Sequence, residues 1–500
     1  MSEMKSLAKD TAIYGISSIV GKFLNWLLVP LYTYVLKETA DYGIVTHLYA
    51  WTALLLVILT YGMETGFFRF ANREGYNPGQ VYRTAWFSLL VTSTLFAVVC
   101  VLFQQPIAGA MGYTGHEEFI ALLAVVVAMD AFSCIPFAYL RYRRRPIAFA
   151  ALKLLFVGLN IAFSLFFLVV CPKIQDSALI SPWFDPNYGV GYVFIANILA
   201  TGIQTVCLLF ITMPARGREN RASWTLWREM IRYSLPLLVL GVAGIMNQTL
   251  DRIIFPYLYV GDDANAQLGI YGACFKLAMV MMMFTQAFRY AYEPFVFSKH
   301  KDRNSVEAYA DAMKYYIIFS YLILLIMTVY LDLLKYLIPR VYWQGLFIVP
   351  IVLWTYIFQG VYFNLSFWYK LTDQTRWGAY FSLIGLAITF TLQVIFVPKL
   401  SYLASAFSST VCYFVIMLLS YFIGRKHLPI PYDFRSIGGY TSLTLGLLSC
   451  YYGFRMLGLN SWLLMLVGTA LLFIYLIILV RRDFPLSGLP VVGKYFKNSK

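Results

Sequence analysis

The sequence predicts an all-α polytopic membrane protein. Of its 500 residues, 60% are hydrophobic and only 13% are charged, whereas a soluble domain usually carries about 25% charged residues. The mean hydropathy is +0.68. Apolar runs of roughly 20 residues, each long enough to cross a bilayer as a helix, recur along the whole chain. Apolar and polar residues do not alternate within these runs, which argues against the strands of a membrane β-barrel.

About fourteen apolar segments are predicted as membrane helices. The first is preceded by "MSEMKSLAKDTAIYG", which has no small-residue cleavage site, so we interpret it as a retained helix and not as a removed signal. The predicted segments cover residues 10–36, 42–66, 82–104, 118–140, 146–170, 189–213, 231–258, 267–297, 312–334, 346–369, 377–397, 401–424, 436–456 and 461–480.

The distribution of Lys and Arg predicts the orientation of these helices. On one side of the membrane the loops and termini collect 28 of the 39 basic residues, the opposite side has 6, and 5 lie within the segments. Because basic loops stay on the cytoplasmic side, both termini are predicted to be cytoplasmic and the number of helices to be even. The net charge of +15 is therefore mostly a topology signal, with attraction to anionic lipid headgroups as a second use. We expect no binding to nucleic acid.

Several classes of function are disfavoured by what the sequence lacks. The seven cysteines are scattered without a C-x-x-C pair and the four histidines lie far apart, so neither a disulfide framework nor a metal site is expected. No nucleotide-binding P-loop occurs, so we expect no ATP hydrolysis and no cofactor. No loop on the outer side exceeds roughly 18 residues, which leaves no room for a folded extracellular domain. Function is therefore expected inside the helix bundle.

An internal repeat relates the first and seventh segments. A shift of 226 positions aligns residues 15–44 with 241–270 without a gap through a helix, a loop and the start of the next helix. The identical pairs include Gly43 with Gly269 and Pro30 with Pro256. The two prolines lie near the outer ends of their helices, where such helices could bend.

The repeat predicts three parts: an N-terminal six-helix half (1–215), a C-terminal six-helix half (216–430), and two extra helices with a basic cytoplasmic tail (431–500). Because six is even, both halves cross the membrane in the same direction and are parallel repeats about an axis along the membrane normal. Transporters that rock one half against the other use such repeats. Duplication without motion is the alternative interpretation.

Five cations lie within the apolar segments, where each ionisable residue costs about 2.5–3.5 kcal/mol on insertion scales. Lys22 and Lys276 have no acidic residue within one helical turn, so we expect both to face a wet interior. Arg252 follows Asp251 directly, and Arg289 lies four residues before Glu293. Both pairs are open to a purely local ion-pair interpretation.

The remaining interior charges lie in the N-terminal half. Asp130 and Lys153 lie at similar depth and could form a structural salt bridge. Glu64 lies near a cytoplasmic helix end, where its side chain could reach the headgroups. The five cations outnumber the acids Glu64, Asp130, Asp251 and Glu293 by one. A cationic interior suits an anionic cargo such as a diphosphate headgroup.

The stretch "LDRIIFPYLYVGDDANAQLGIYGACFKLAMVMMMFTQAFRYAYEPF" resembles the polysaccharide-exporter branch of the multidrug/oligosaccharidyl-lipid/polysaccharide (MOP) superfamily. Its Asp-Arg near the end of one helix, followed by a short loop and L-G-I-Y, is typical of that branch. The opening "YGISSIVGKFLNWLLVPLYTYVL", followed by "DYGIV", resembles the first helix pair of the same branch. The resemblance implies a MATE-like fold of two six-helix repeats with two C-terminal helices.

The resemblance further implies a flippase of the bacterial inner membrane and not an enzyme. Its substrate would be a polyprenyl-diphosphate-linked oligosaccharide for O-antigen, capsule or exopolysaccharide assembly. Its partners would be membrane lipids, a polysaccharide polymerase and a chain-length regulator. By chemistry and not by matched motif, Lys22, Arg252, Lys276 and Arg289 are the candidate substrate-binding cations.

Asp130, Asp251 and Glu293 are candidates for ion coupling or for structural roles. A cation-coupled multidrug exporter of the same superfamily is the first alternative function. A glycan polymerase or ligase and a scaffold without transport are the others.

Overall fold

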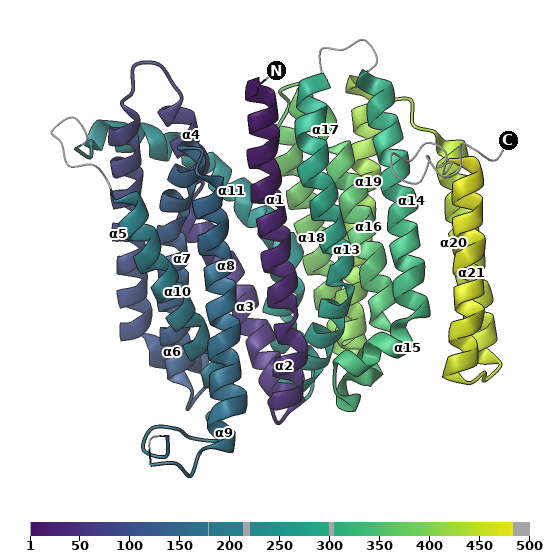
Figure 1. The fold of residues 1–500 in the computed structure, drawn as a ribbon, viewed down its shortest axis with the longest axis horizontal. Coiled ribbons are helices and arrows are strands. Elements are labelled where there is room, and N and C mark those ends of the chain that lie inside the picture. Colours follow the sequence, from purple (N-terminus) through teal and green to yellow (C-terminus); the bar gives the residue numbers. More distant parts are fainter. Residues whose placement is uncertain (1, 179, 214–220, 300–304, 484–500) are drawn as a thin grey trace.

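The computed structural model describes residues 2–178, 180–213, 221–299 and 305–483. Long helices run side by side between two opposite faces of the molecule (Figure 1). α1 begins and α21 ends at the same face, which we call the N face; the other is the far face (Figure 1). Arg216, Arg218, Lys301, Arg303, Lys494, Lys497 and Lys500, which the sequence assigns to the basic side, lie outside the described residues.

The helices of the first half of the chain are α1 (Ser2–Trp26), α2 (Leu28–Val35), α3 (Thr39–Thr60), α4 (Met63–Ala71), α5 (Pro78–Leu102), α6 (Gln104–Met111), α7 (Glu117–Tyr142), α8 (Pro146–Leu165), α9 (Cys171–Lys173) and α10 (Val190–Thr212). A π-helical turn, Phe166–Val170, joins α8 to α9. The later helices are α11 (Trp224–Ile253), α12 (Phe255–Leu258), α13 (Ala264–Lys299), α14 (Ser305–Val329), α15 (Leu331–Leu334), α16 (Ile348–Leu365), α17 (Phe367–Leu371), α18 (Arg376–Leu400), α19 (Tyr402–His427), α20 (Phe434–Met456) and α21 (Ser461–Arg482).

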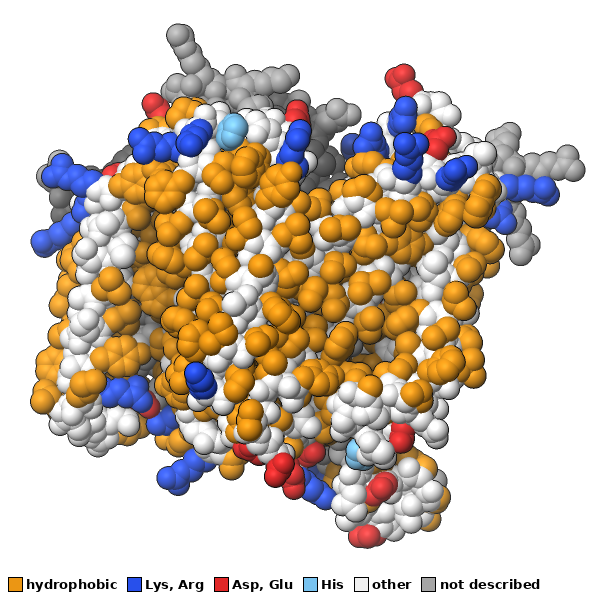
Figure 2. Space-filling model, turned by 180° about the vertical axis from the view of Figure 1, so that it is seen from behind, with side chains coloured by type: hydrophobic (Ala, Val, Ile, Leu, Met, Phe, Trp, Pro, Cys, Tyr) orange, Lys and Arg blue, Asp and Glu red, His pale blue; other side chains and the backbone are white. Residues whose placement is uncertain are grey.

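Thirteen helices among the described residues are long and apolar enough to cross a membrane. The remaining predicted segment, 436–456, forms α20, whose glycine, serine and threonine residues lower its hydropathy. An apolar band surrounds the molecule between the two faces, and Lys and Arg side chains gather along the N face (Figure 2). The prediction of an all-α polytopic membrane protein is confirmed.

Two helix breaks occur at equivalent places in the sequence repeat. α1 ends at Trp26 and α2 begins at Leu28, two residues before Pro30. α11 ends at Ile253 and α12 begins at Phe255, one residue before Pro256. Proline has no backbone N–H and its ring clashes with the carbonyl four residues earlier, which interrupts the helix just before it. Helices therefore break at both of the matched prolines.

α3 and α13 cross with their backbones in direct contact near the far face. A Cβ atom placed on Gly43 would lie 1.8 Å from the carbonyl oxygen of Asn265, and one placed on Gly269 would lie 1.9 Å from that of Thr39. The 226-residue shift that relates Gly43 to Gly269 also relates Thr39 to Asn265. The two contacts are thus equivalent under the repeat, and the approximate symmetry axis passes through this crossing.

A buried imidazole links α3 to the end of α11 beside this crossing. His47 is fully buried, and its Nδ1 lies 2.6 Å from the hydroxyl of Tyr113. Its Nε2 lies 3.1 Å from the carbonyl oxygen of Ile253 and 3.1 Å from Nε1 of Trp51. The contact with Ile253 joins the two halves of the chain on the far side of the membrane.

Further contacts join the two halves nearer the N face. Near Pro236, α11 passes over the start of α4, where a Cβ atom on Gly62 would lie 3.0 Å from the carbonyl oxygen of Ser234. The Tyr76 hydroxyl donates to Glu229 at 2.6 Å. α1 also contacts α13, because Tyr290 lies against Gly15. The halves thus meet on both sides of the membrane.

Ion pairs fasten the C-terminal helices α20 and α21 to α14. Lys314 of α14 pairs with Asp483 and lies 3.7 Å from Asp433, which precedes α20. Hydrogen bonds from Ser436 hold the pKa of Asp433 below its usual range. On the far side, Arg455 of α20 lies 3.9 Å from Asp332 of α15. The helix pair is therefore held to the bundle at both ends.

We expect Gly269→Ala to destabilise the protein by about 1–3 kcal/mol, because the added methyl forces α13 away from α3. Thermal unfolding of the purified protein in detergent measures the effect. Gly158→Ala in α8 is the matched control, since a Cβ atom there meets nothing within 4 Å. Equal melting temperatures for the two variants would contradict a tight crossing.

Candidate functional site

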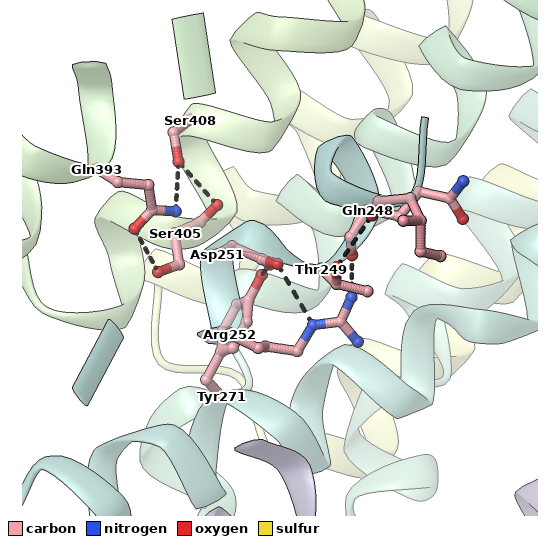
Figure 3. A network of polar contacts seen from close by, with 9 residues as sticks. Gln248, Thr249, Asp251, Arg252, Tyr271, Gln393, Ser405 and Ser408 are labelled. Atoms are coloured by element: carbon pink, nitrogen blue, oxygen red, sulfur yellow. Dashed lines mark hydrogen bonds and ion pairs between the residues drawn. The ribbon is translucent and has the colours of Figure 1, made fainter. Parts of the chain in front are cut away.

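Asp251 and Arg252 form a satisfied pair at the end of α11. Asp251 is 3% exposed and accepts a hydrogen bond from the Tyr271 hydroxyl of α13. Arg252 Nε lies 3.3 Å from Asp251 Oδ1, and a terminal nitrogen of its guanidinium donates to the carbonyl of Gln248 (Figure 3). The guanidinium also lies over the ring of Phe275, 4.6 Å from its centre. The two charges compensate each other and join α11 to α13.

A second polar network, also drawn in Figure 3, joins two neighbouring helices of the same half. Gln393 of α18 donates to Ser408 of α19 at 2.9 Å and accepts from Ser405 at 3.2 Å. All three side chains are fully buried. The network satisfies every partner it contains, so we assign it to packing of α18 against α19.

Lys276 lies on α13 close to Arg252 but has no acidic neighbour. Its backbone carbonyl accepts a hydrogen bond of 2.7 Å from Nε1 of Trp26, at the end of α1. Its ammonium lies near enough to Arg252 for the two positive charges to repel each other. Within the described part of the chain no carboxylate lies within ion-pair distance of Lys276. Its charge is therefore not compensated by the protein.

Lys22 of α1 reaches across to α13 in the other half of the chain. Its Nζ donates to Oε1 of Gln286 at 2.6 Å. Lys22 also lies near enough to Arg289 for the two cations to repel each other. The described residues place no carboxylate within ion-pair distance of Lys22, so an amide is its nearest partner.

Arg289, Glu293 and Lys370 form a cluster nearer the N face. Glu293 Oε1 lies 3.4 Å from Arg289 and 3.7 Å from Lys370. Both cations also lie over the ring of Phe363, at 4.5 and 4.7 Å from its centre. Arg289 is half exposed. One carboxylate is thus shared by two cations, which leaves the cluster with a net positive charge.

A cavity of about 300 Å³ extends from this cluster into the C-terminal half of the chain. Helices α11, α13, α16, α17, α18 and α19 contribute to its wall. Its polar lining residues are Asn247, Gln248, Thr285, Gln286, Arg289, Gln359, Tyr362, Ser366, Tyr369, Lys370, Ser382 and Tyr413. None of the described residues in the wall is Asp or Glu. We call this space the C-half cavity.

The interior charges of the N-terminal half lie apart from this cavity. Asp130 and Lys153 are near enough to interact electrostatically, although no ion pair within 4 Å joins them among the described residues. The ammonium of Lys153 instead lies 4.0 Å from the centre of the Phe137 ring. Glu64 is paired with Arg141 of α7 and accepts a hydrogen bond from Cys134. Glu64 is therefore held by a cross-helix pair.

The structure brings the sequence-predicted cations into two groups. Lys22 and Arg289 lie together at the C-half cavity, and Arg252 and Lys276 lie together deeper in the bundle. Sequence reasoning missed Lys370, which it assigned to a loop, and the polar wall around Gln359. A signal was present: Gln359, Tyr362, Phe363, Ser366 and Lys370 follow the three- and four-residue spacing of one helix face.

The fold and the interior polar sites define a MOP-type transporter. The chain is similar to the lipid II flippase MurJ in an inward closed conformation, with a TM-score of 0.71, 12% identity, and coverage of 94% of this chain and 99% of that chain. It is also similar to an inward-facing multidrug resistance MATE family transporter of the MOP superfamily, with a TM-score of 0.66, 12% identity, and coverage of 84% and 96%. For the MATE multidrug transporter DinF-BH the values are 0.60, 17%, 83% and 96%.

Residues 7–298 match the family described as polysaccharide biosynthesis protein, and the chain belongs to that family. This match covers more than half of the chain. Among curated proteins, none matches this sequence. The resemblance inferred from the Asp-Arg stretch is confirmed.

We expect Arg252→Ala to destabilise the protein by about 3–5 kcal/mol, because it leaves the buried Asp251 carboxylate without its counter-charge. Adding Asp251→Asn removes that carboxylate charge and restores much of the loss. Thermal unfolding of the two single variants and the double variant measures the coupling. Additive effects would contradict a mutually dependent pair.

Proposed function

We propose that this transporter moves a polyprenyl-diphosphate-linked oligosaccharide across the bacterial inner membrane by alternating access. The cargo is an O-antigen, capsule or exopolysaccharide repeat unit. The N face and both termini lie in the cytoplasm, where the basic loops hold them. The lipid tail stays in the bilayer while the hydrated head crosses between the halves 1–215 and 216–430, flanked by residues 431–500. No covalent bond is made or broken, so the protein is not an enzyme.

The observation that carries this proposal is the surplus of positive charge at Lys22, Arg289 and Lys370. One carboxylate, Glu293, pairs with two of these three cations, and Lys22 and Arg289 repel each other. Helix packing alone does not account for such an arrangement, since buried charges in proteins are normally paired. A diphosphate supplies the missing negative charge, and Arg and Lys are the residues that bind phosphates most strongly. Lys276 and Arg252 provide a second cationic point deeper in the bundle.

The acids of the interior are candidates for coupling transport to an ion gradient. Asp251 and Glu293 each contact a cation. Asp130 is related to Lys153 only at longer range. A proton or sodium ion bound at one of these three carboxylates would change the local charge, which is the physical requirement for coupling. On the outer side, a polysaccharide polymerase and a chain-length regulator are the proposed partners that use the same lipid-linked product.

A cation-coupled multidrug exporter is the second candidate, favoured by the similarity in fold to MATE transporters. A cationic drug requires negative charge in its site. The described wall of the C-half cavity contains Arg289 and Lys370 and no carboxylate, while Glu293 is engaged by these two cations. The charge of the cavity therefore favours an anionic cargo over a cationic one.

We expect Lys22→Ala to lower export of surface polysaccharide by at least about tenfold, because a hydrogen bond to a charged group contributes roughly 1.5–3 kcal/mol. Export is measured as polysaccharide at the surface of cells whose own copy of the gene is replaced by the variant. Lys22→Arg, which keeps the charge, should retain most of the export.

Lys426→Ala is the matched control, since Lys426 is an exposed cation at the N-face end of α19. It should leave export unchanged at equal protein level. Normal export by Lys22→Ala, or drug sensitivity in place of polysaccharide loss, would argue against the proposed substrate.

A further inference from the structure

The chemical character of the C-half cavity changes along its depth. α13 runs from the far face to the N face, and Arg289 lies seven residues beyond Met282, or about 10 Å closer to the N face at the rise of an α-helix. Lys370 lies eleven residues beyond Gln359 in the same direction. The cations therefore occupy the end nearer the N face, and the deeper part of the wall is uncharged.

The deeper part presents amide groups whose orientation is fixed by the protein. Gln359 donates one N–H to the Tyr413 hydroxyl at 2.9 Å, and Asn247 donates one to the carbonyl of Ser382 at 2.8 Å. A primary amide has two N–H donors and a carbonyl acceptor. Gln359 thus keeps its carbonyl oxygen and one N–H without a partner among the described residues. Each amide is anchored by one bond and retains capacity to bind a ligand.

Gln286 extends this set toward the cations. Its carbonyl oxygen accepts from Lys22, while its NH₂ group has no partner within the part of the chain that the structure describes. The side chain therefore stands between the cationic end and the neutral end. A ligand that contacts Lys22 can reach Gln286 with its next polar atoms.

Tyrosine side chains complete the neutral wall. Tyr362, Tyr369 and Tyr413 all line the cavity, from α16, α17 and α19. An aromatic ring offers an apolar face for the C–H surface of a sugar, and the hydroxyl adds a donor and an acceptor. Paired amides beside tyrosine rings, without a carboxylate, match a neutral polyhydroxylated ligand better than an ion.

A second cavity of about 720 Å³ in the N-terminal half shows the contrast. Its wall includes Leu48, Trp51, Phe96, Phe103 and Ile107 and contains no charged residue among those described. Such a surface suits a hydrocarbon chain and offers little to a sugar. The two halves thus differ in which part of an amphiphilic ligand they can bind.

We propose that the neutral end of the C-half cavity, around Gln359, Asn247 and Tyr362, binds a sugar residue of the lipid-linked cargo, while Lys22, Arg289 and Lys370 hold its diphosphate. The inference rests on the proposed function and divides that one site into two parts. A volume of about 300 Å³ is at the lower end of small-molecule sites. The cavity therefore receives the sugar nearest the diphosphate and not a whole repeat unit.

Two lipid probes separate the two parts of the site. The full-length protein in lipid nanodiscs is titrated with undecaprenyl diphosphate and with undecaprenyl diphosphate carrying one N-acetylglucosamine. Wild type should bind the sugar-bearing lipid more tightly. Gln359→Leu should weaken binding of that lipid by about tenfold, because a buried polar partner is lost, and leave the bare diphosphate unchanged. Arg289→Ala should weaken binding of both lipids.

Gln344→Leu is the matched control, since Gln344 is exposed near the far face and outside the cavity. Tyr362→Phe removes only a hydroxyl and repeats the test if Gln359→Leu does not fold. Equal weakening of both probes by Gln359→Leu, no weakening of either, or equal affinity of wild type for both overturns the sugar site and leaves the proposed function standing. Failure of wild type to bind either probe overturns the proposed function and the sugar site together.

Discussion

The backbone contact between α3 and α13 determines how the two halves of this protein meet. Gly43 and Gly269 are at equivalent positions of the repeat, and each faces a carbonyl group of the opposite helix that a methyl group could not tolerate. In a bilayer, association of helices depends on close packing and polar contacts, because the lipid is as apolar as the helix surface. Small residues at one crossing therefore set the distance and the angle of the helices beside it, α1 and α11 included.

That arrangement explains why the interior cations lie in two groups. α1 meets α13 on the N-face side of the crossing, which brings Lys22 to Gln286 and near Arg289. α11 meets α13 near the crossing itself, which brings Arg252 near Lys276. The repeat does not duplicate these charges, because Lys22 aligns with Gln248 and Arg252 aligns with Trp26. The halves share a backbone plan and carry different chemistry, as expected for a ligand whose two ends differ.

The sequence was sufficient for properties that depend on composition and local spacing. Apolar runs predicted the helices, and the matched prolines Pro30 and Pro256 predicted where two of them break. Contacts between distant segments were not predictable in this way. The partner of Glu64 is Arg141, 77 residues away, and no local pattern marks it. Lys370 looked like a loop residue because it lies close to the polar stretch before α18, whereas the helix break before α17 lets it reach the cavity.

The contacts of His47 have a consequence for the far side of the molecule. Its Nε2 lies within reach of a donor, the indole of Trp51, and an acceptor, the carbonyl of Ile253. A neutral imidazole carries its proton on one nitrogen only. With the proton on Nε2, the ring bonds the other half of the chain; with the proton on Nδ1, it bonds Trp51 of its own helix. Exchange between two tautomers, with rotation of the Tyr113 hydroxyl and no change in net charge, therefore makes or releases one bond between the halves.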